Sequence, residues 1–198
     1  MARQHLIPSE PRVARPASRL WNTLKTLGQI TVMWSVLLGL MPLAIVRVEW
    51  WIPLPRLPDT GRLGAIVFAL ASLLGLFTAN ALVRDGEGTP LPLDTARKLV
   101  IAGPYRYVRN PMAMFGFAQA IGIGLWLRSP GVLAYVAVGM AIWQWLARPW
   151  EEADLERRFG DSYRRYRAAV SCWIPRLTPY RDNGVSLPPR RSTSRSSS

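Results

Sequence analysis

The sequence has one cysteine and one histidine among its 198 residues. A single cysteine excludes an internal disulfide and supplies too little sulfur for a zinc site built of thiolates. The lone histidine, His5, precedes every segment that is expected to fold, which excludes Ser-His-Asp catalysis, Cys-His catalysis and histidine-based metal sites. We therefore predict no metal, and any chemistry must use carboxylate, guanidinium, phenol, amide or backbone groups.

Charged residues are also scarce, at 19% of the chain, and four long apolar runs contain none. Residues 27–46 and 63–83 are charge-free runs of 20 and 21 residues. At about 1.5 Å per residue, each is long enough for the ~30 Å hydrocarbon core of a bilayer. Residues 112–127 and 132–147 are charge-free runs of 16 residues, which is short for a full span. The pattern predicts an all-α, polytopic membrane protein with about four membrane-spanning helices.

The net charge of +13 fits either a nucleic-acid-binding protein or a membrane protein with basic loops. The distribution of Lys and Arg favours the second interpretation. Both terminal regions and the connection between the second and third runs hold 21 of these residues, and the two alternate connections hold four. This asymmetry predicts a multi-pass protein of the cell (inner) membrane with both termini in the cytoplasm. The bilayer is then the expected partner, and no nucleic acid is expected.

The chain divides by composition into a core and two tails. Residues 1–18 are predicted to be a disordered basic N-terminus, and residues 182–198 a disordered Arg/Ser-rich tail. Residues 19–181 form the predicted integral membrane domain. The link from Arg128 to Gly131 is so short that the last two apolar runs should form an antiparallel helical hairpin.

Some residues inside the apolar runs permit two interpretations. Small residues at every fourth position indicate close helix packing, although Gly122 and Gly124 could instead leave room for a ligand. The amides of Gln119 and Gln144 could form interhelical hydrogen bonds or line a pocket. The small residues in question are Ala71, Gly75, Ala79, Gly116, Ala120 and Gly124.

The region after the hairpin is polar and is predicted to lie outside the membrane. Pro149 should end the fourth span and begin a new helix, which should stop at Gly160. Asp161 is a candidate N-cap for a second short helix, residues 162–170. An apolar and aromatic face repeats at helical spacing and should lie on the membrane surface or cover the hairpin. That face comprises Leu155, Phe159, Tyr163, Tyr166 and Val170.

Two polar segments flank the predicted hairpin and should lie close together, because the hairpin brings its open ends to one side. Residues 98–112 lead into the third run, and residues 148–152 follow the fourth. Together they place adjacent carboxylates, arginines, tyrosines and an asparagine around one interface pocket. Such a set suits a ligand with ammonium and anionic groups next to an apolar substrate. A salt-bridged helix end with interfacial tyrosines remains the alternative.

The same segments resemble the isoprenylcysteine carboxyl methyltransferase family, including its bacterial relatives and, more distantly, the phospholipid N-methyltransferases. The resemblance covers residues 84–177 and rests on an ordered set of motifs. These are Gly103-Pro-Tyr-Arg-Tyr-Val-Arg-Asn-Pro-Met112, then Glu151-Glu152, then Phe159-Gly160, Tyr163, Tyr166 and Ile174-Pro175. The resemblance implies an all-helical membrane enzyme that uses S-adenosylmethionine as cofactor and methylates a lipid-like or lipid-tethered acceptor at the cytoplasmic interface.

The resemblance also implies roles for individual residues. It assigns Arg148, with Arg109, to the catalytic and substrate-facing part of the site. It assigns cofactor binding to Lys98, Leu99, Val100, Tyr105, Asn110, Pro111, Met112, Glu151 and Glu152. Asn110 stands where the eukaryotic enzymes usually have histidine.

Two other functions remain as alternatives. A membrane sterol-type reductase shares a related hairpin and turn but binds NADPH, whose phosphates prefer cations to the paired carboxylates Glu151 and Glu152. A non-catalytic membrane protein with the same fold is the other alternative. Methyl transfer suits the composition better, because an activated methyl group needs only alignment and exclusion of water.

Overall fold

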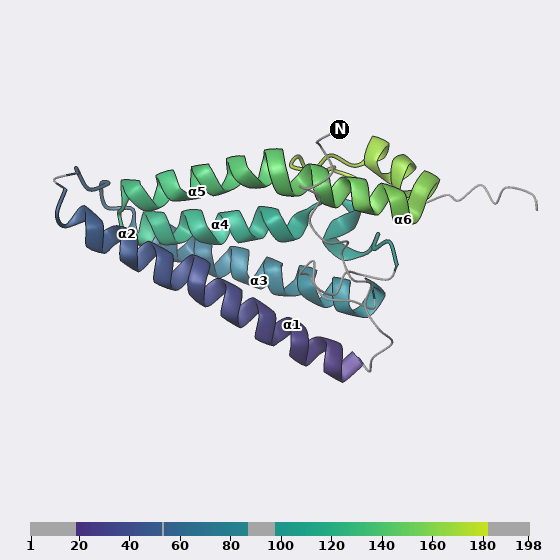
Figure 1. Ribbon diagram of the computed structural model, residues 1–198, viewed down its shortest axis with the longest axis horizontal. Helices are drawn as coiled ribbons and strands as arrows, with labels where there is room; N and C mark the ends of the chain where they lie inside the picture. The colour runs from purple at the N-terminus through teal and green to yellow at the C-terminus, as the bar shows by residue number, and fades with distance from the viewer. Residues whose placement is uncertain (1–18, 53, 87–97, 182–198) are drawn as a thin grey trace, which may run out of the picture.

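Four helical stretches run roughly along the long axis of the molecule in the computed structural model, which describes residues 19–52, 54–86 and 98–181 (Figure 1). The predicted disordered tails lie outside the described residues. No strand occurs in the described part, which confirms the all-α prediction. The stretches are α1 (Arg19–Trp34), η1 (Ser35–Leu40) and α2 (Met41–Glu49); α3 (Gly61–Gly86); α4 (Pro111–Trp126); and α5 (Pro130–Ile142), η4 (Trp143–Ala147) and α6 (Arg148–Ala169).

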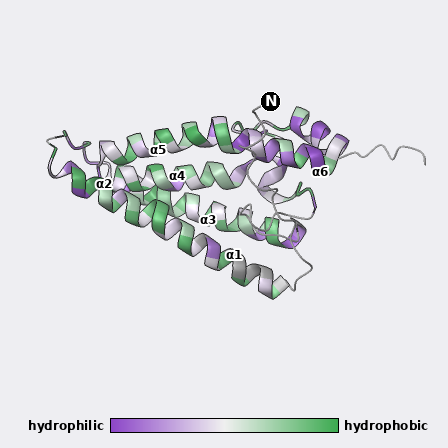
Figure 2. Cartoon of the chain, viewed as in Figure 1, coloured by the Kyte–Doolittle hydropathy of each residue, from purple (hydrophilic) through white to green (hydrophobic). Residues whose placement is uncertain are grey.

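Three of these stretches are long and apolar enough to cross a membrane. They are Leu27–Glu49, Gly61–Asp85 and Pro130–Ala169, and in the last the apolar part, residues 130–147, ends where charged residues begin. Figure 2 shows the change from apolar α5 to polar α6. The third run, residues 112–127, became α4, whose 16 residues reach about 24 Å. Three spans thus meet the length criterion, and a full fourth span stays a prediction.

The helices α3 and α4 pack against each other more extensively than any other pair. Their backbones come close together at Gly64 and Gly122. A Cβ added to Gly64 would lie 2.3 Å from the Trp126 backbone nitrogen and 2.5 Å from the Gly122 carbonyl oxygen. Ala71 and Ala120, from the predicted small-residue stripe, are also buried. Gly122 therefore serves close packing, and the alternative that it leaves room for a ligand is wrong.

The predicted hairpin is formed by α4 and α5, which lie side by side and are joined by residues 127–129 (Figure 1). Arg128 takes a positive φ of 54° in this turn, and the Ser129 side chain caps α5. The Glu49 carboxylate at the end of α2 accepts hydrogen bonds from Ser129 Oγ (2.8 Å) and the Gly131 N–H (2.7 Å). A carboxylate at a helix N-terminus is stabilising, so Glu49 fastens the first helical stretch to the hairpin.

The two glutamines inside apolar helices form hydrogen bonds. The Gln119 amide donates to Ser72 Oγ at 2.9 Å and joins α4 to α3. Gln144 accepts from the Trp173 indole N–H at 2.8 Å and so holds the C-terminal segment against η4. The interhelical hydrogen bond predicted as one alternative is therefore confirmed for Gln119, whereas Gln144 bonds to a segment outside the helices, and neither glutamine lines the cavity described below.

A new helix, α6, begins at Arg148 with Pro149 in its first turn, as predicted, but the expected break between it and the preceding helix does not occur. The helix continues from α5 through a π-helical turn at Trp143–Ala147 into α6. The Arg148 N–H bonds to the Trp143 carbonyl, five residues back. In this wider turn the backbone hydrogen bonds span five residues instead of four, just before Pro149. Pro149 therefore lies in the first turn of α6, where the N–H that proline lacks is not needed.

The predicted stop at Gly160 is present as a sharp kink inside α6, where Gly160 takes φ 51° and ψ −126°. After the kink the helix turns back, so Tyr163, Tyr166 and Val170 are buried against Leu99 and Ile101. The aromatic face therefore packs on the 98–101 segment, which is neither of the two predicted placements, the membrane surface and the hairpin. The Asp161 carboxylate forms an ion pair with Arg164.

Candidate active site

A cavity of about 560 Å³ lies where the two polar segments meet, at the α6 end of the bundle. One end is lined by charged and amide side chains from residues 98–110 and from the first two turns of α6. The remainder is apolar and runs between the first helical stretch and the α4–α5 hairpin, as far as Leu37 and Tyr135. The cavity thus joins a polar end to an apolar channel, which is the shape that an amphipathic ligand requires.

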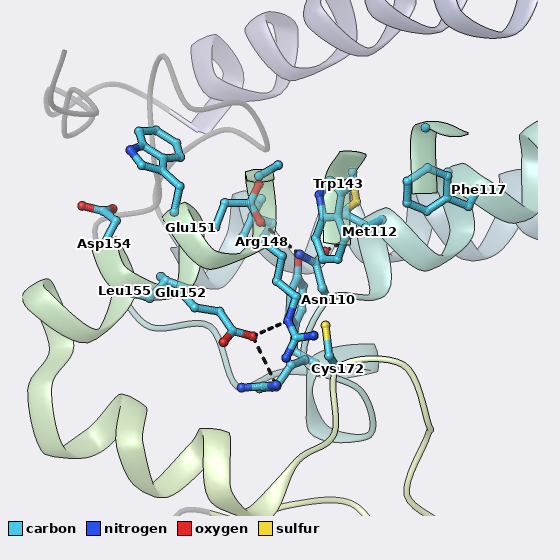
Figure 3. Close-up of a pocket in the computed structure, with 18 of the residues that line it drawn as sticks. Asn110, Met112, Phe117, Trp143, Arg148, Glu151, Glu152, Asp154, Leu155 and Cys172 are labelled. Atoms are coloured by element: carbon cyan, nitrogen blue, oxygen red, sulfur yellow. Dashed lines mark hydrogen bonds and ion pairs between the residues drawn. The ribbon is translucent and has the colours of Figure 1, made fainter. Parts of the chain in front are cut away.

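Two arginines share one carboxylate at the polar end. Arg148 Nε lies 2.9 Å from Glu152 Oε1, and Arg109 Nη2 lies 3.2 Å from the same oxygen. Figure 3 marks both contacts with dashed lines. Arg148 and Glu152 are four residues apart on α6, whereas Arg109 precedes α4, so the carboxylate also ties the two polar segments together. The three charges leave one positive charge in excess.

The second carboxylate of the pair has a different partner. Glu151 Oε2 accepts a hydrogen bond from Asn110 Nδ2 at 3.2 Å. Asn110 is fixed because its Oδ1 accepts from the Ala113 N–H (3.1 Å) and caps α4. In Figure 3 Asn110 lies among Arg148, Met112 and Glu151. Asn110 thus supplies an amide that both starts a helix and orients a cavity carboxylate.

The pKa of Glu151 is raised to about 7, chiefly because the carboxyl is buried; the hydrogen bond from Asn110 opposes the rise and the neighbouring Glu152 adds to it. With a pKa of about 7, Glu151 exchanges its proton near neutral pH. A carboxylate in a dry site with a raised pKa is stabilised in its charged form by any cation that binds beside it. Glu151 is therefore a candidate partner for a ligand ammonium or sulfonium group.

Tyrosines close the polar end and stay protonated. Desolvation raises the pKa of Tyr163 to about 12, and burial also raises the pKa values of Tyr105 and Tyr166. Tyr166 uses its proton to donate a 2.6 Å hydrogen bond to the Tyr105 carbonyl. This bond holds the short 3₁₀ helix η3 (Gly103–Arg106) in place over the returning half of α6.

Aromatic rings surround the start of the apolar channel. Phe117 from α4 and Trp143 from η4 line the cavity with their ring centroids 6.3 Å apart (Figure 3). Trp173 packs edge-on against Trp143 at 5.1 Å. The apolar walls also include Trp34 and Leu38 of the first helical stretch.

The structure brings ten of the eleven predicted site residues to this cavity; the exception is Pro111. Pro111 is fully buried in the first turn of α4 and does not line the cavity. Residues 98–100 form a loop with no helix or strand assigned, and all three line the cavity. The ten lining residues are Lys98, Leu99, Val100, Tyr105, Arg109, Asn110, Met112, Arg148, Glu151 and Glu152.

Other lining residues were not predicted as site residues. Asp154 is buried beside the cavity and pairs with Arg157 (2.7 Å) and Arg158 (3.2 Å). Cys172 lines it from the C-terminal segment, and burial raises the pKa of its thiol. The spacing of Asp154 three residues after Glu151, on the same helix face, could have indicated it. No feature of the sequence pointed to Cys172, or to the residues of the first helical stretch, as lining the cavity.

The chain matches the sequence model of the phospholipid methyltransferase family over residues 60–162. It belongs to this family. The match includes α3, α4, α5 and the whole of both polar segments, so it confirms the resemblance to membrane methyltransferases of the isoprenylcysteine and phospholipid type. No curated protein and no solved structure matched the chain. As a family member it is a membrane methyltransferase, and the reductase and non-catalytic alternatives receive no support.

Proposed function

We propose that this protein transfers a methyl group from S-adenosylmethionine to a lipid-like or lipid-tethered acceptor at the cytoplasmic face of the inner membrane. The observation that carries the proposal is the single cavity that joins the Glu151–Asn110 and Arg109–Glu152–Arg148 clusters to an apolar channel. The family match supports methyl transfer as the reaction class. The polar end and the apolar channel of this cavity are both lined by described residues of the 19–181 domain.

The donor set fits the cofactor. S-adenosylmethionine carries a cationic ammonium, a carboxylate and a sulfonium, and when bound it supplies a methyl group that is already activated. Glu151, with its raised pKa, offers the negative charge that a buried ammonium needs. The remaining cofactor contacts implied by the family resemblance, Lys98 to Val100, Tyr105 and Met112, lie around the same end. Pro111 acts indirectly by starting α4.

The chain's own part in the reaction is alignment and exclusion of water. Asn110 and the paired carboxylates fix the polar end of the cavity, and Phe117 with Trp143 forms an apolar collar beside it. A hydrocarbon chain in the channel would place its polar head at this collar. Holding two reactants in line lowers the entropic part of the barrier, and a dry collar keeps water from competing as methyl acceptor.

Cofactor binding should depend on pH through Glu151. The carboxylate has a pKa of about 7 in the free protein, and a bound ammonium would lower that value, so protons and cofactor compete. The affinity for S-adenosylhomocysteine should therefore be constant above about pH 7 and fall by about tenfold per pH unit below it. Titration calorimetry between about pH 5.5 and 7.5 measures this slope, and Glu151→Gln should flatten it. An unchanged slope in the variant would contradict the assignment.

The orientation in the membrane follows from the Lys/Arg asymmetry. Reporter fusions placed after Asp59 and after Ser198 should report opposite sides of the membrane, with Ser198 cytoplasmic. Asp59 lies at the end of the bundle remote from the cavity, with the α4–α5 turn, since the nearby Leu57 N–H bonds to the Arg128 carbonyl at 3.1 Å. Two reporters on the same side would contradict the proposed topology and with it the cytoplasmic location of the cavity.

A further inference from the structure

A second groove, of about 480 Å³, lies between α3 and α4 and is separate from the active-site cavity. Its apolar walls include Leu74 and Phe77 of α3 and Phe115 of α4. None of these residues lines the cavity, which meets α4 at Ala113 and Phe117 instead. At one end the groove is lined by η3 and becomes polar. It therefore has an apolar length and a polar end, like the cavity, but on another face of α4.

The groove begins near the end of the apolar layer. Phe77 lies six residues before Val83, where the charge-free run ends, so it lies about 9 Å inside that layer. Gly103 of η3 takes φ 52°, and a Cβ added to it would lie 3.4 Å from the Ala81 Cβ. The short helix η3 thus rests on α3 one turn beyond Phe77 and closes the groove there. In the proposed topology this end lies in the cytoplasmic leaflet.

Arg106 lines the polar end and is held by two hydrogen bonds to Tyr180. Its Nε donates to the Tyr180 carbonyl at 3.0 Å, and its own carbonyl accepts from the Tyr180 N–H at 2.8 Å. The terminal nitrogens Nη1 and Nη2 are accessible, and they form no hydrogen bond or ion pair with the residues that the structure describes. No carboxylate is among the described residues that line the groove. A fixed guanidinium with accessible N–H groups suits a phosphate, which it can bind through two parallel hydrogen bonds.

The segment after α6 presents apolar side chains beside this polar end. Pro175 lines the groove, and the nearby Ile174 and Leu177 are 74% and 100% exposed. The Arg176 N–H donates to the Tyr107 carbonyl at 2.9 Å, which holds the segment against the end of η3. Exposed apolar side chains next to arginines are typical of a segment that lies at a membrane interface. The polar end of the groove therefore lies at the level of the lipid headgroups.

We propose that this groove binds one anionic phospholipid of the bilayer, with an acyl chain between α3 and α4 and the phosphate on the Nη1 and Nη2 groups of Arg106. Charge favours this occupant over a second copy of the chain, because each copy carries a net charge of +13. The cytoplasmic leaflet is anionic, and basic pockets between membrane helices bind anionic headgroups. The groove takes no part in methyl transfer, so the inference goes beyond the proposed function.

Native mass spectrometry of the purified protein in detergent tests the proposal. The probes are dioleoylphosphatidylglycerol and dioleoylphosphatidylcholine, which share their acyl chains and differ in headgroup charge. The variant is Arg106→Gln, and Arg128→Gln is the matched control at the remote end of the bundle. Arg128 forms the same pair of bonds: its Nε donates to the Leu57 carbonyl at 2.9 Å, and its carbonyl accepts from the Leu57 N–H at 3.1 Å. Thermal unfolding checks that both variants are folded.

A phosphatidylglycerol with a photoreactive acyl chain provides a second measurement, which uses the wild-type protein alone. Its label should appear on residues 74–77, on the α3 wall of the groove. Label confined to residues 33–38 would place the lipid in the active-site cavity and overturn the proposal.

We expect the wild-type protein to retain phosphatidylglycerol as its first lipid at least about fivefold over phosphatidylcholine. Arg106→Gln should lower this preference below about twofold, and Arg128→Gln should leave it unchanged. A wild-type protein without the preference overturns the proposal, as does a preference that survives in Arg106→Gln or is lost equally in Arg128→Gln. A dimer without a lipid preference would assign the groove to a second copy and would also overturn it.

Discussion

Glu151→Gln should lower the affinity for S-adenosylhomocysteine by about ten- to hundredfold without unfolding the protein. The substitution keeps the size of the side chain and a carbonyl oxygen that can still accept from Asn110 Nδ2, but it removes the negative charge. A charge-assisted hydrogen bond in a partly dry site contributes roughly 1.5–3 kcal/mol, which corresponds to that range of affinity. Because burial disfavours the charged carboxylate, the neutral amide should leave the fold as stable or slightly more stable.

Glu156→Gln is the matched control for this experiment. Glu156 lies on the same helix and carries the same charge, but it faces away from the cavity and pairs with Arg164 (3.5 Å) and Arg167 (2.9 Å). Its substitution should change the calorimetric affinity by less than about twofold, since exposed ion pairs contribute little. Equal affinities for wild type and Glu151→Gln would leave Glu151 as part of a salt-bridged helix end.

Gly64→Ala should destabilise the protein by roughly 3 kcal/mol or more. The added methyl group would meet backbone atoms of α4 at 2.3–2.8 Å, and backbone cannot move aside as a flexible side chain can. The two helices would have to separate, which would open the largest interhelical contact of the bundle. Overpacking of this kind usually costs about 1–3 kcal/mol, and a backbone clash belongs at the upper end.

The comparison with Gly75→Ala isolates the clash from the general effect of replacing glycine in a helix. Gly75 lies on the same helix, and its added Cβ would meet only the Phe115 Cβ at an ordinary 3.8 Å. We expect this variant to be neutral or stabilised by up to about 1 kcal/mol through helix propensity. Thermal unfolding of both variants in one detergent provides the measurement. If both unfold at the same temperature, the close approach of α3 and α4 is not as described.

The helices and the position of the site could be predicted because they follow from local rules. Charge-free runs define the apolar helices, and the short link at Arg128 leaves only an antiparallel hairpin, whose open ends bring residues 98–112 next to residues 148–152. Those two segments became the polar end of the cavity. The proline at position 149 misled the prediction, since a π-helical turn can carry a helix past proline by a backbone arrangement that no residue pattern marks.

Other parts depend on three-dimensional arrangement that residue types alone do not encode. Trp34 and Leu38 line the channel, yet an apolar side chain that faces a cavity is chemically the same as one that faces lipid. Among the glycines of α3, Gly64 lies against the backbone of α4, whereas the spacing of small residues pointed to Gly75. Likewise, no residue pattern shows that Arg109 and Arg148 both pair with the Glu152 carboxylate.

Methyl transfer into a lipid fraction is the most direct test of the proposed function. The purified protein is incubated with methyl-labelled S-adenosylmethionine and, in separate reactions, with membrane-lipid and cytosolic extracts. The polar end of the cavity opens into an apolar channel, so we predict label in the lipid-soluble products, strongly reduced in Glu151→Gln and retained in Glu156→Gln. Label that appears only in water-soluble products would contradict the lipid acceptor, and label that appears in neither fraction would contradict methyl transfer itself.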